Sequence, residues 1–249
     1  MTRFFRSLLL VCAGTALVWA VPLRAQTFSE TQRGEIEGIV KAYLIAHPEV
    51  IQEVMTEIEK RQVEAEAEKH KEGVKQYSKA LFYSPRQVTL GNPDGDVTMV
   101  EFFDYNCGFC RRALADMLDL MKDDPKLRVV LKEFPVLGPG SVEAAQVAVA
   151  VRMQDKDGRK YLEFHQKLLS SRGQADRAHA LAVAKEIGLD MGRIEKDMVS
   201  DEAKETIDEN MKMAEALGLN GTPSYVIGSD VVVGAVGLAA LKEKVAAAR

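Results

Sequence analysis

A short apolar strand that runs into a Cys-x-x-Cys pair is the feature that most constrains this chain. Residues 99–103 read Met-Val-Glu-Phe-Phe, and Cys107-Gly108-Phe109-Cys110 opens a segment with helical periodicity shortly afterwards. Two thiols at this spacing on the first turn of a helix can close a small disulfide ring and open it again. We therefore expect the fold of the rest of the domain to position these two cysteines.

The first 25 residues are typical of a secretory signal peptide. Arg3 and Arg6 precede an almost unbroken apolar run over residues 7–20, which is short for a membrane span, and Ala25 offers a small residue for cleavage. An uncleaved membrane anchor is the alternative. We predict export to the periplasm with cleavage near Ala25.

Removal of residues 1–25 makes the chain more acidic. Lys plus Arg falls from 33 to 30 against 37 Asp plus Glu, so the formal net charge changes from −4 to −7. An acidic chain without a basic cluster argues against a nucleic-acid partner. The same cleavage removes Cys12 and leaves Cys107 and Cys110 as the two cysteines of the mature sequence.

These two cysteines are predicted to be reactive. The loop that they close is too small to restrain much of the unfolded chain, and a chain of this length needs no stabilising disulfide to fold. A tetrahedral zinc site would need two further ligands. We therefore predict no metal site, and no cofactor besides the redox-active disulfide Cys107–Cys110. The histidines that could have supplied zinc ligands are scattered without ligand spacing: His47, His70, His165 and His179.

The thiolate is the nucleophile of thiol–disulfide exchange, so the position of each sulfur matters. Cys107 stands where the strand gives way to the helix, and the free N–H groups and dipole of a helix start favour an anion there. Cys110 lies one turn later and is expected to face inward and to resolve a mixed disulfide formed at Cys107. Gly108 and Phe109 carry no positive charge, so the activation should be weaker than in a Cys-Pro-His-Cys site.

Residues 26–83 are predicted to be helical and unusually polar. Ser29 and Gln32 form a capping-box pattern, and Pro48 separates two helices. The apolar stripe of the second helix thins into charged residues after Ile58. We favour an oligomerisation or stalk segment; a solvated helix against its own domain and a disordered segment are the alternatives.

Residues 84–249 alternate between strand and helix patterns and predict an α/β domain. Strands are expected at 87–90, 97–103 and 127–131, the last two parallel because a helical crossover joins them. A helical insertion is expected at about 141–217. It precedes an antiparallel hairpin, with strands at 224–227 and 231–233, and a closing helix.

The stretch 102–110, together with Gly221-Thr222-Pro223 far downstream, resembles the DsbA-type branch of the thioredoxin superfamily over residues 84–249. The resemblance implies a thioredoxin fold with a helical insertion. It also implies a cis Pro223 beside the Cys107–Cys110 disulfide and a Thr222 backbone that pairs with a bound peptide. Gly108 and Phe109, between the two cysteines, are expected to join this substrate-binding surface.

Two charged residues match further features of that family. Glu101 lies six residues before Cys107, and Lys132 ends the next parallel strand. The resemblance implies that they pair beneath the buried Cys110 and handle its proton, with the carboxylate as general base. A charge pair at the surface ends of two strands is the alternative.

The polar helices before the first strand separate this chain from DsbA-type monomers. The His47-Pro48-Glu49-Val50 stretch and the charged helix are more similar to ScsC-type relatives, whose N-terminal region oligomerises. Thr222, the residue before the proline, is similar to the residue in the same motif of the disulfide isomerases. We predict a periplasmic thiol–disulfide oxidoreductase, an isomerase or reductase that forms a homo-oligomer through the N-terminal helices. Its expected partners are unfolded or misoxidised exported proteins and a membrane redox partner. The alternatives are a monomeric DsbA-like dithiol oxidase and a periplasmic copper-binding chaperone that uses the dithiol.

Overall fold

The computed structural model describes residues 28–155 and 157–249, and the chain divides into two compact units at residues 57 and 58. The predicted signal peptide lies outside the described residues. Within the described residues, no helix combines the length and the apolar character needed to cross a membrane.

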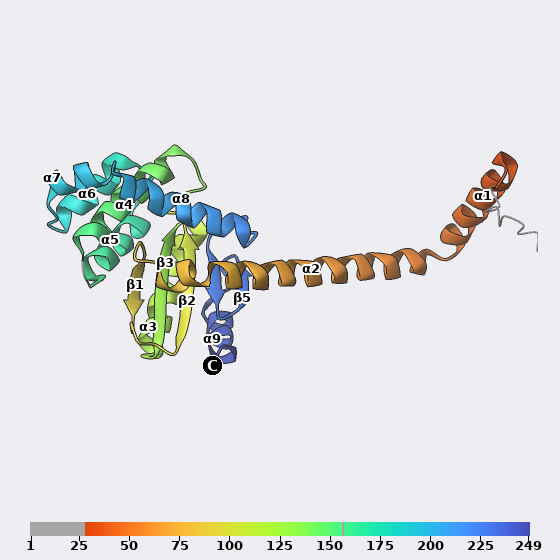
Figure 1. Cartoon of the computed structure of the whole chain (residues 1–249), viewed down its shortest axis with the longest axis horizontal. Coiled ribbons are helices and arrows are strands. Elements are labelled where there is room, and N and C mark those ends of the chain that lie inside the picture. Colours follow the sequence, from red (N-terminus) through yellow and green to blue (C-terminus); the bar gives the residue numbers. More distant parts are fainter. Residues whose placement is uncertain (1–27, 156) are drawn as a thin grey trace, which may run out of the picture. The chain divides into compact units, whose positions relative to one another are not determined.

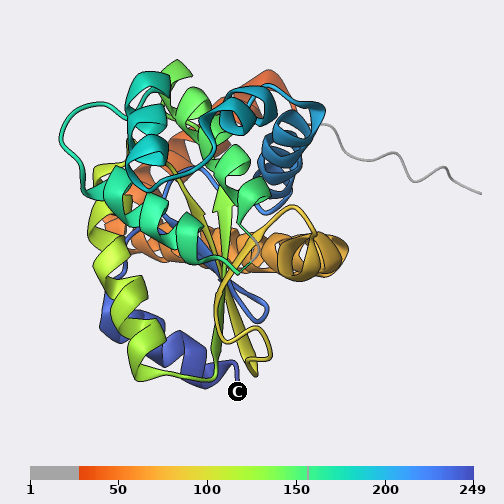
Figure 2. The ribbon, with the colours of Figure 1, turned by 90° about the vertical axis from the view of Figure 1, so that its left-hand side faces the viewer.

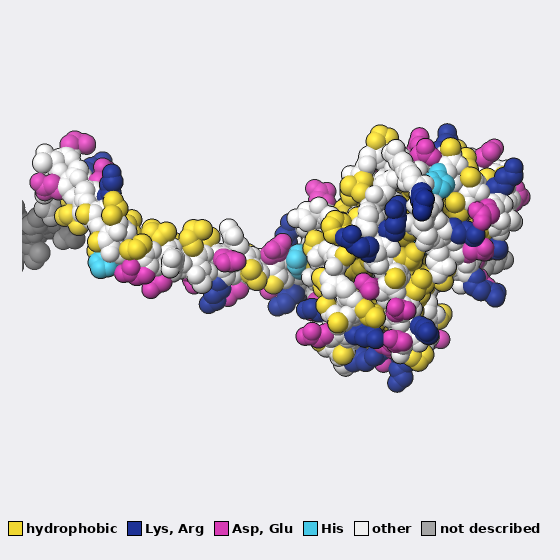
Figure 3. Space-filling view, turned by 180° about the vertical axis from the view of Figure 1, so that it is seen from behind, with side chains coloured by type: hydrophobic (Ala, Val, Ile, Leu, Met, Phe, Trp, Pro, Cys, Tyr) yellow, Lys and Arg dark blue, Asp and Glu magenta, His cyan; other side chains and the backbone are white. Residues whose placement is uncertain are grey.

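The first unit contains helix α1 (Glu30–Ala46) and the first turns of helix α2 (Pro48–Tyr83). The predicted capping box is confirmed, because Gln32 N donates to the Ser29 hydroxyl and Ser29 N donates to the Gln32 side chain. No residue of α1 is buried. Figure 3 shows hydrophobic side chains on the surface of this region.

A five-stranded sheet forms the centre of the second unit (Figure 1). Strand β2 pairs in parallel with β3, and the remaining neighbours pair antiparallel, in the order β1-β3-β2-β4-β5. The predicted parallel pair and the predicted hairpin β4–β5 are both confirmed. The strands are β1 (Val88–Gly91), β2 (Val97–Phe103), β3 (Leu127–Glu133), β4 (Ser224–Ile227) and β5 (Asp230–Val233).

The helices of the second unit follow the predicted order. Helix α3 (Gly108–Asp123) is the crossover between β2 and β3, and α9 (Leu238–Ala247) closes the chain. The insertion predicted at about 141–217 corresponds to five helices: α4 (Pro139–Gln154), α5 (Arg159–Ser170), α6 (Arg177–Glu186), α7 (Met191–Asp197) and α8 (Asp201–Ala216).

The two faces of the sheet bury separate cores because successive side chains of a strand point to opposite faces. Met99 and Phe103 of β2 join the core with α3, α9 and most of the insertion, whereas Val100 and Phe102 join the core with α8 and the end of α2. Figure 2 shows α3 and α9 on one side of the sheet. The Cys-x-x-Cys helix therefore covers the face that carries the odd-numbered residues of β2.

The last turns of α2 belong to the second unit, although the N-terminal region was predicted to extend to residue 83. Val74 and Leu81 are buried in the core with α8. Gly73 permits this packing, since a Cβ atom there would stand 3.0 Å from the carbonyl oxygen of Ala216 at the end of α8.

Candidate active site

A buried carboxylate shapes the turn between β2 and the Cys-x-x-Cys helix. The Oδ1 atom of Asp104 accepts hydrogen bonds from Asn106 N at 2.8 Å and Ser141 Oγ at 2.7 Å, and Oδ2 accepts one from Leu137 N at 2.9 Å. The turn is thereby tied to the loop after β3 and to the start of α4. Asp104 was not among the predicted site residues, although Asp side chains often accept a hydrogen bond from the backbone N–H two residues later in turns.

The two cysteines stand at the start of α3, and both are free thiols. Cys107 is the N-cap residue and is 7% exposed, whereas Cys110 in the first turn is 1% exposed. Burial raises the pKa of the Cys110 thiol far above its usual range, and the nearby charge of Glu101 adds to this effect. Cys110 therefore needs a proton acceptor before it can act as a nucleophile.

The dipeptide between the cysteines lies at the surface. The ring of Phe109 is exposed, and the guanidinium carbon of Arg112 lies 4.4 Å from the centre of that ring. Among the described residues, apart from the chain neighbours of Gly108 and the backbone of its own helix, no heavy atom stands within 4 Å of the position that a Cβ atom would take there. Both predicted contact residues are therefore accessible to a polypeptide approaching Cys107.

The downstream Thr-Pro motif lies against Cys107. The Thr222–Pro223 peptide bond is cis, as the resemblance implied. The thiol of Cys107 donates a hydrogen bond to the carbonyl oxygen of Thr222 at 3.2 Å. The Thr-Pro motif thus lies beside the Cys107 thiol.

Glu101 lies on the face of β2 that α3 covers. Its side chain is buried, and its Oε2 atom has no hydrogen-bond partner among the described residues. Burial raises the pKa of this carboxyl to about 8, and the charge of Asp116 on α3 contributes. A carboxyl that titrates near neutral pH beside Cys110 is suited to take up the proton of that thiol.

Lys132 lies on the opposite face of the sheet, so the predicted pairing with Glu101 is wrong. In the parallel register Glu101 aligns with Leu131, and Lys132 aligns with Phe102. The Nζ atom of Lys132 donates to the carbonyl oxygen of Ala80 on α2 at 2.7 Å, and burial lowers the pKa of this lysine to about 8. Because aligned residues share a face, the lysine is separated from Cys110 by the sheet.

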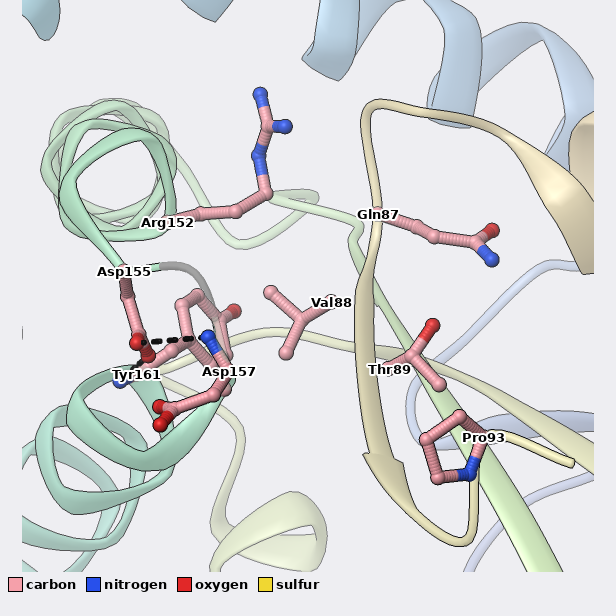
Figure 4. Close-up of a pocket in the computed structure, with 9 residues that line it drawn as sticks. Gln87, Val88, Thr89, Pro93, Arg152, Asp155, Asp157 and Tyr161 are labelled. Carbon is pink, nitrogen blue, oxygen red and sulfur yellow. Dashed lines mark hydrogen bonds between the residues drawn. The ribbon is translucent and has the colours of Figure 1, made fainter.

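A pocket of about 320 Å³ lies elsewhere, between β1 and the helical insertion (Figure 4). Its lining includes Asp155, which accepts hydrogen bonds from Tyr161 N at 2.7 Å and Asp157 N at 3.3 Å. Figure 4 shows the side chains of Arg152 and Gln87 pointing away from these aspartates. None of the predicted site residues lines this pocket. Across residues 28–155 and 157–249, no group of three metal-binding side chains gathers either.

The sequence matches the DSBA-like thioredoxin domain over residues 98–246, which is more than half of the chain, so the protein belongs to this family of thiol–disulfide oxidoreductases. A second match covers residues 32–65, with the N-terminal domain of the copper resistance protein ScsC. The two matches bear out the family resemblance found in the sequence.

Solved structures of similar proteins support this assignment. A thioredoxin-like oxidoreductase from Silicibacter pomeroyi DSS-3 is 44% identical, and the match covers 69% of this chain and 96% of that one, with a TM-score of 0.65. The thiol-disulfide exchange protein alpha-DsbA2 from Wolbachia pipientis is 30% identical over 74% and 98% of the two chains, with a TM-score of 0.68. A linker-deletion mutant of ScsC from Proteus mirabilis shares the fold at 24% identity over 90% and 97%, with a TM-score of 0.67.

Among curated relatives, the chain spans 25% of the length of the Na(+)/H(+) antiporter NhaA 1 of Salinispora arenicola, at 26% identity over 163 residues.

Proposed function

We propose that this protein exchanges disulfides with exported proteins through Cys107 and Cys110. The observation that carries the proposal is the contact between the Cys107 thiol and the Thr222 carbonyl, which joins the two sequence motifs at one surface. The exposed Phe109 beside this contact offers an apolar group to an unfolded chain. With the predicted signal peptide, these features support a periplasmic enzyme.

The reaction uses the different environments of the two sulfurs. The Cys107 thiolate attacks a substrate disulfide, forms a mixed disulfide, and releases the other substrate sulfur as a thiolate. Cys110 then passes its proton to the Glu101 carboxylate and attacks the Cys107 sulfur. The bond between Cys107 and the substrate breaks, and the substrate thiolate leaves with the electron pair. The cysteine pair ends oxidised and the substrate reduced; the reverse sequence introduces a disulfide.

The N-terminal helices support an oligomeric form of the enzyme. Four apolar residues of α1 recur at helical spacing, and four residues of α2 repeat the same spacing. All eight are exposed: Ile36, Ile39, Val40 and Tyr43 of α1, and Ile51, Val54, Met55 and Ile58 of α2. An exposed stripe of this kind fits a second copy of the same chain. Several active sites in one assembly would favour an isomerase or a reductase, kept reduced by a membrane redox partner, over a monomeric oxidase.

Refolding of scrambled ribonuclease by the full-length mature chain tests the function. We expect reactivation in a thiol buffer with the pair reduced, and no reactivation beyond the buffer alone with Cys107→Ser. An oxidase would instead restore activity to reduced ribonuclease and leave the scrambled form unchanged. Equal reactivation by the wild type and Cys107→Ser would contradict the proposed exchange function.

Copper binding by the dithiol is the second candidate. The match of residues 32–65 to the N-terminal domain of a copper resistance protein favours it, and two thiolates can hold Cu(I). Titration of the reduced chain with Cu(I) distinguishes the two functions. Tight binding of one ion per Cys pair, without activity on ribonuclease, would favour the chaperone.

A further inference from the structure

Tyr225 is the residue of β4 that stands directly opposite Glu101. Strands β2 and β4 are antiparallel, and their register aligns Glu101 with Tyr225. Directly opposed residues of an antiparallel pair project from the same face, with their Cβ atoms about 5 Å apart. Both side chains are buried, at 3% and 1% exposure. A phenol and a carboxylic acid are thus enclosed side by side beneath α3.

The residues near Glu101 on the neighbouring strands differ in whether their side chains can donate a hydrogen bond to its carboxyl group. The residue aligned with Glu101 on β3 is Leu131, which has no polar atom in its side chain. Lys132 faces the opposite core, and Ser224, next to Tyr225, donates its hydroxyl to the Gly221 carbonyl at 2.7 Å. Of the two cross-strand neighbours of Glu101, Tyr225 is therefore the one whose side chain carries a hydrogen-bond donor.

Helix α3 brings the reacting thiol to the same face. Cys110 and Tyr225 are members of one buried core. Burial raises the pKa of Tyr225 far above its ordinary value, and the charges of Glu101, Cys110, Asp116 and Cys107 raise it further. The titratable groups that face Glu101 are thus Tyr225 from β4 and Cys110 and Asp116 from α3. Tyr225 therefore keeps its proton, and its hydroxyl can act as a hydrogen-bond donor.

We propose that Tyr225 is a positioning residue, whose hydroxyl holds and stabilises the Glu101 carboxylate while that group accepts the proton of Cys110. The proposal rests on the proposed exchange function. In the dithiol structure Oε2 of Glu101 has no partner among the described residues. A neutral acid tolerates this arrangement, but a buried carboxylate needs a donor. The phenol provides that donor when Glu101 ionises before the resolving step.

The resolving step can be isolated with 5,5′-dithiobis(2-nitrobenzoate). The Cys107 thiolate attacks the reagent, forms a mixed disulfide and releases one thionitrobenzoate. Cys110 then gives its proton to Glu101, attacks the Cys107 sulfur and releases the second thionitrobenzoate. The pH profile of this second phase in stopped flow reports the ionisation of Glu101.

Tyr225→Phe should shift the inflection of that profile to higher pH by about one unit, because loss of a donor to a carboxylate raises the carboxyl pKa. Below the inflection the second phase should then be about tenfold slower, since each pH unit changes the ionised fraction tenfold. Tyr161→Phe is the matched control, because it removes the hydroxyl of an equally buried tyrosine that donates to Glu133. It should leave the inflection in place.

Two further results decide the proposal. In a Glu101→Gln background, adding Tyr225→Phe should cause no additional change, since the two residues act through one carboxylate. If Tyr225→Phe does not fold, carbon NMR of the wild type replaces it: the ring carbon that bears the Tyr225 hydroxyl should shift with the Glu101 titration and lose that shift in Glu101→Gln. An unmoved inflection, additive effects, or a Tyr225 signal insensitive to Glu101 would overturn the proposal. A wild type that releases only one thionitrobenzoate would instead overturn the exchange function.

Discussion

The sulfur of Cys107 lies 3.2 Å from the carbonyl oxygen of Thr222, although the two residues are 115 positions apart in the chain. The intervening chain includes β3 and all the helices of the insertion. The sheet brings the ends together, because β4 follows the Thr-Pro motif and pairs with β2, the strand that leads to Cys107. The pairing of β4 with β2 therefore brings the Thr-Pro motif and Cys107 together.

The buried carboxyl of Glu101 should make the stability of the reduced protein depend on pH. Its pKa is 4.5 in its ordinary state and about 8 in the fold. Between these values the unfolded chain binds fewer protons than the folded one, so the free energy of unfolding should fall as pH rises, by up to about 1.4 kcal/mol per pH unit for this group. Above pH 8 its contribution should level off.

Urea denaturation of Glu101→Gln between about pH 5 and 8 measures this contribution. The variant should show a shallower fall than the wild type at equal protein concentration. Glu215→Gln alters an exposed carboxyl and serves as the control, with the slope of the wild type. Identical slopes for all three proteins would mean that Glu101 ionises freely in the fold.

Lys132→Met should leave the pH profile of the resolving step unchanged, with a rate within about twofold of the wild type, because the sheet separates Lys132 from Cys110. The same variant removes the donor to the Ala80 carbonyl and should affect the packing of α2 instead. Stopped-flow measurement of the second thionitrobenzoate phase checks the first statement. A shift of the inflection comparable to that in Glu101 variants would mean that Lys132 takes part in the proton transfer.

Asp104→Ala should destabilise the fold by about 2–4 kcal/mol, because it leaves the N–H groups of Asn106 and Leu137 and the Ser141 hydroxyl without their acceptor. Ser141→Ala removes one of the three bonds and should cost about 1 kcal/mol. Urea denaturation of both variants gives the comparison. An Asp104→Ala cost no larger than that of Ser141→Ala would mean that the carboxylate does not organise the turn.

Val54→Glu should disrupt the oligomer, because it places a charge in the apolar stripe of the N-terminal helices. Gln52→Glu introduces the same group two residues away, outside the stripe, and should preserve the assembly. Light scattering of the full-length mature chain after size exclusion measures both masses. A wild type that is already monomeric would contradict the oligomer, and equal masses for the two variants would exclude the stripe as the interface.

Short motifs and local patterns made much of this protein predictable from its sequence. The Cys pair, the Thr-Pro motif, the parallel strands and the hairpin each depend on residues close together in the chain. The face occupied by Lys132 was not predictable, because it depends on the offset between β2 and β3. The crossover aligns Val97 with Leu127, and a shift of one residue would exchange the faces.

The sequence favours an oligomerisation or stalk segment for α2 and leaves its packing against its own domain as an alternative, for a similar reason. Its end is a charged helix with few apolar residues, and its fit depends on the absence of a side chain at Gly73 opposite a carbonyl of α8. Tyr225 carried no signal of its own, since an aromatic residue in a buried strand is ordinary core. Its position became informative only once the register placed it opposite Glu101.

Trapping of the mixed disulfide shows directly which cysteine attacks a substrate disulfide. The full-length Cys110→Ser variant is incubated with a disulfide-bonded peptide, quenched in acid and examined by mass spectrometry, with Cys107→Ser in parallel. We expect one peptide attached to Cys107 in Cys110→Ser and none in Cys107→Ser. Peptide attached to Cys110 in Cys107→Ser to the same extent, or no adduct in either variant, would contradict this expectation.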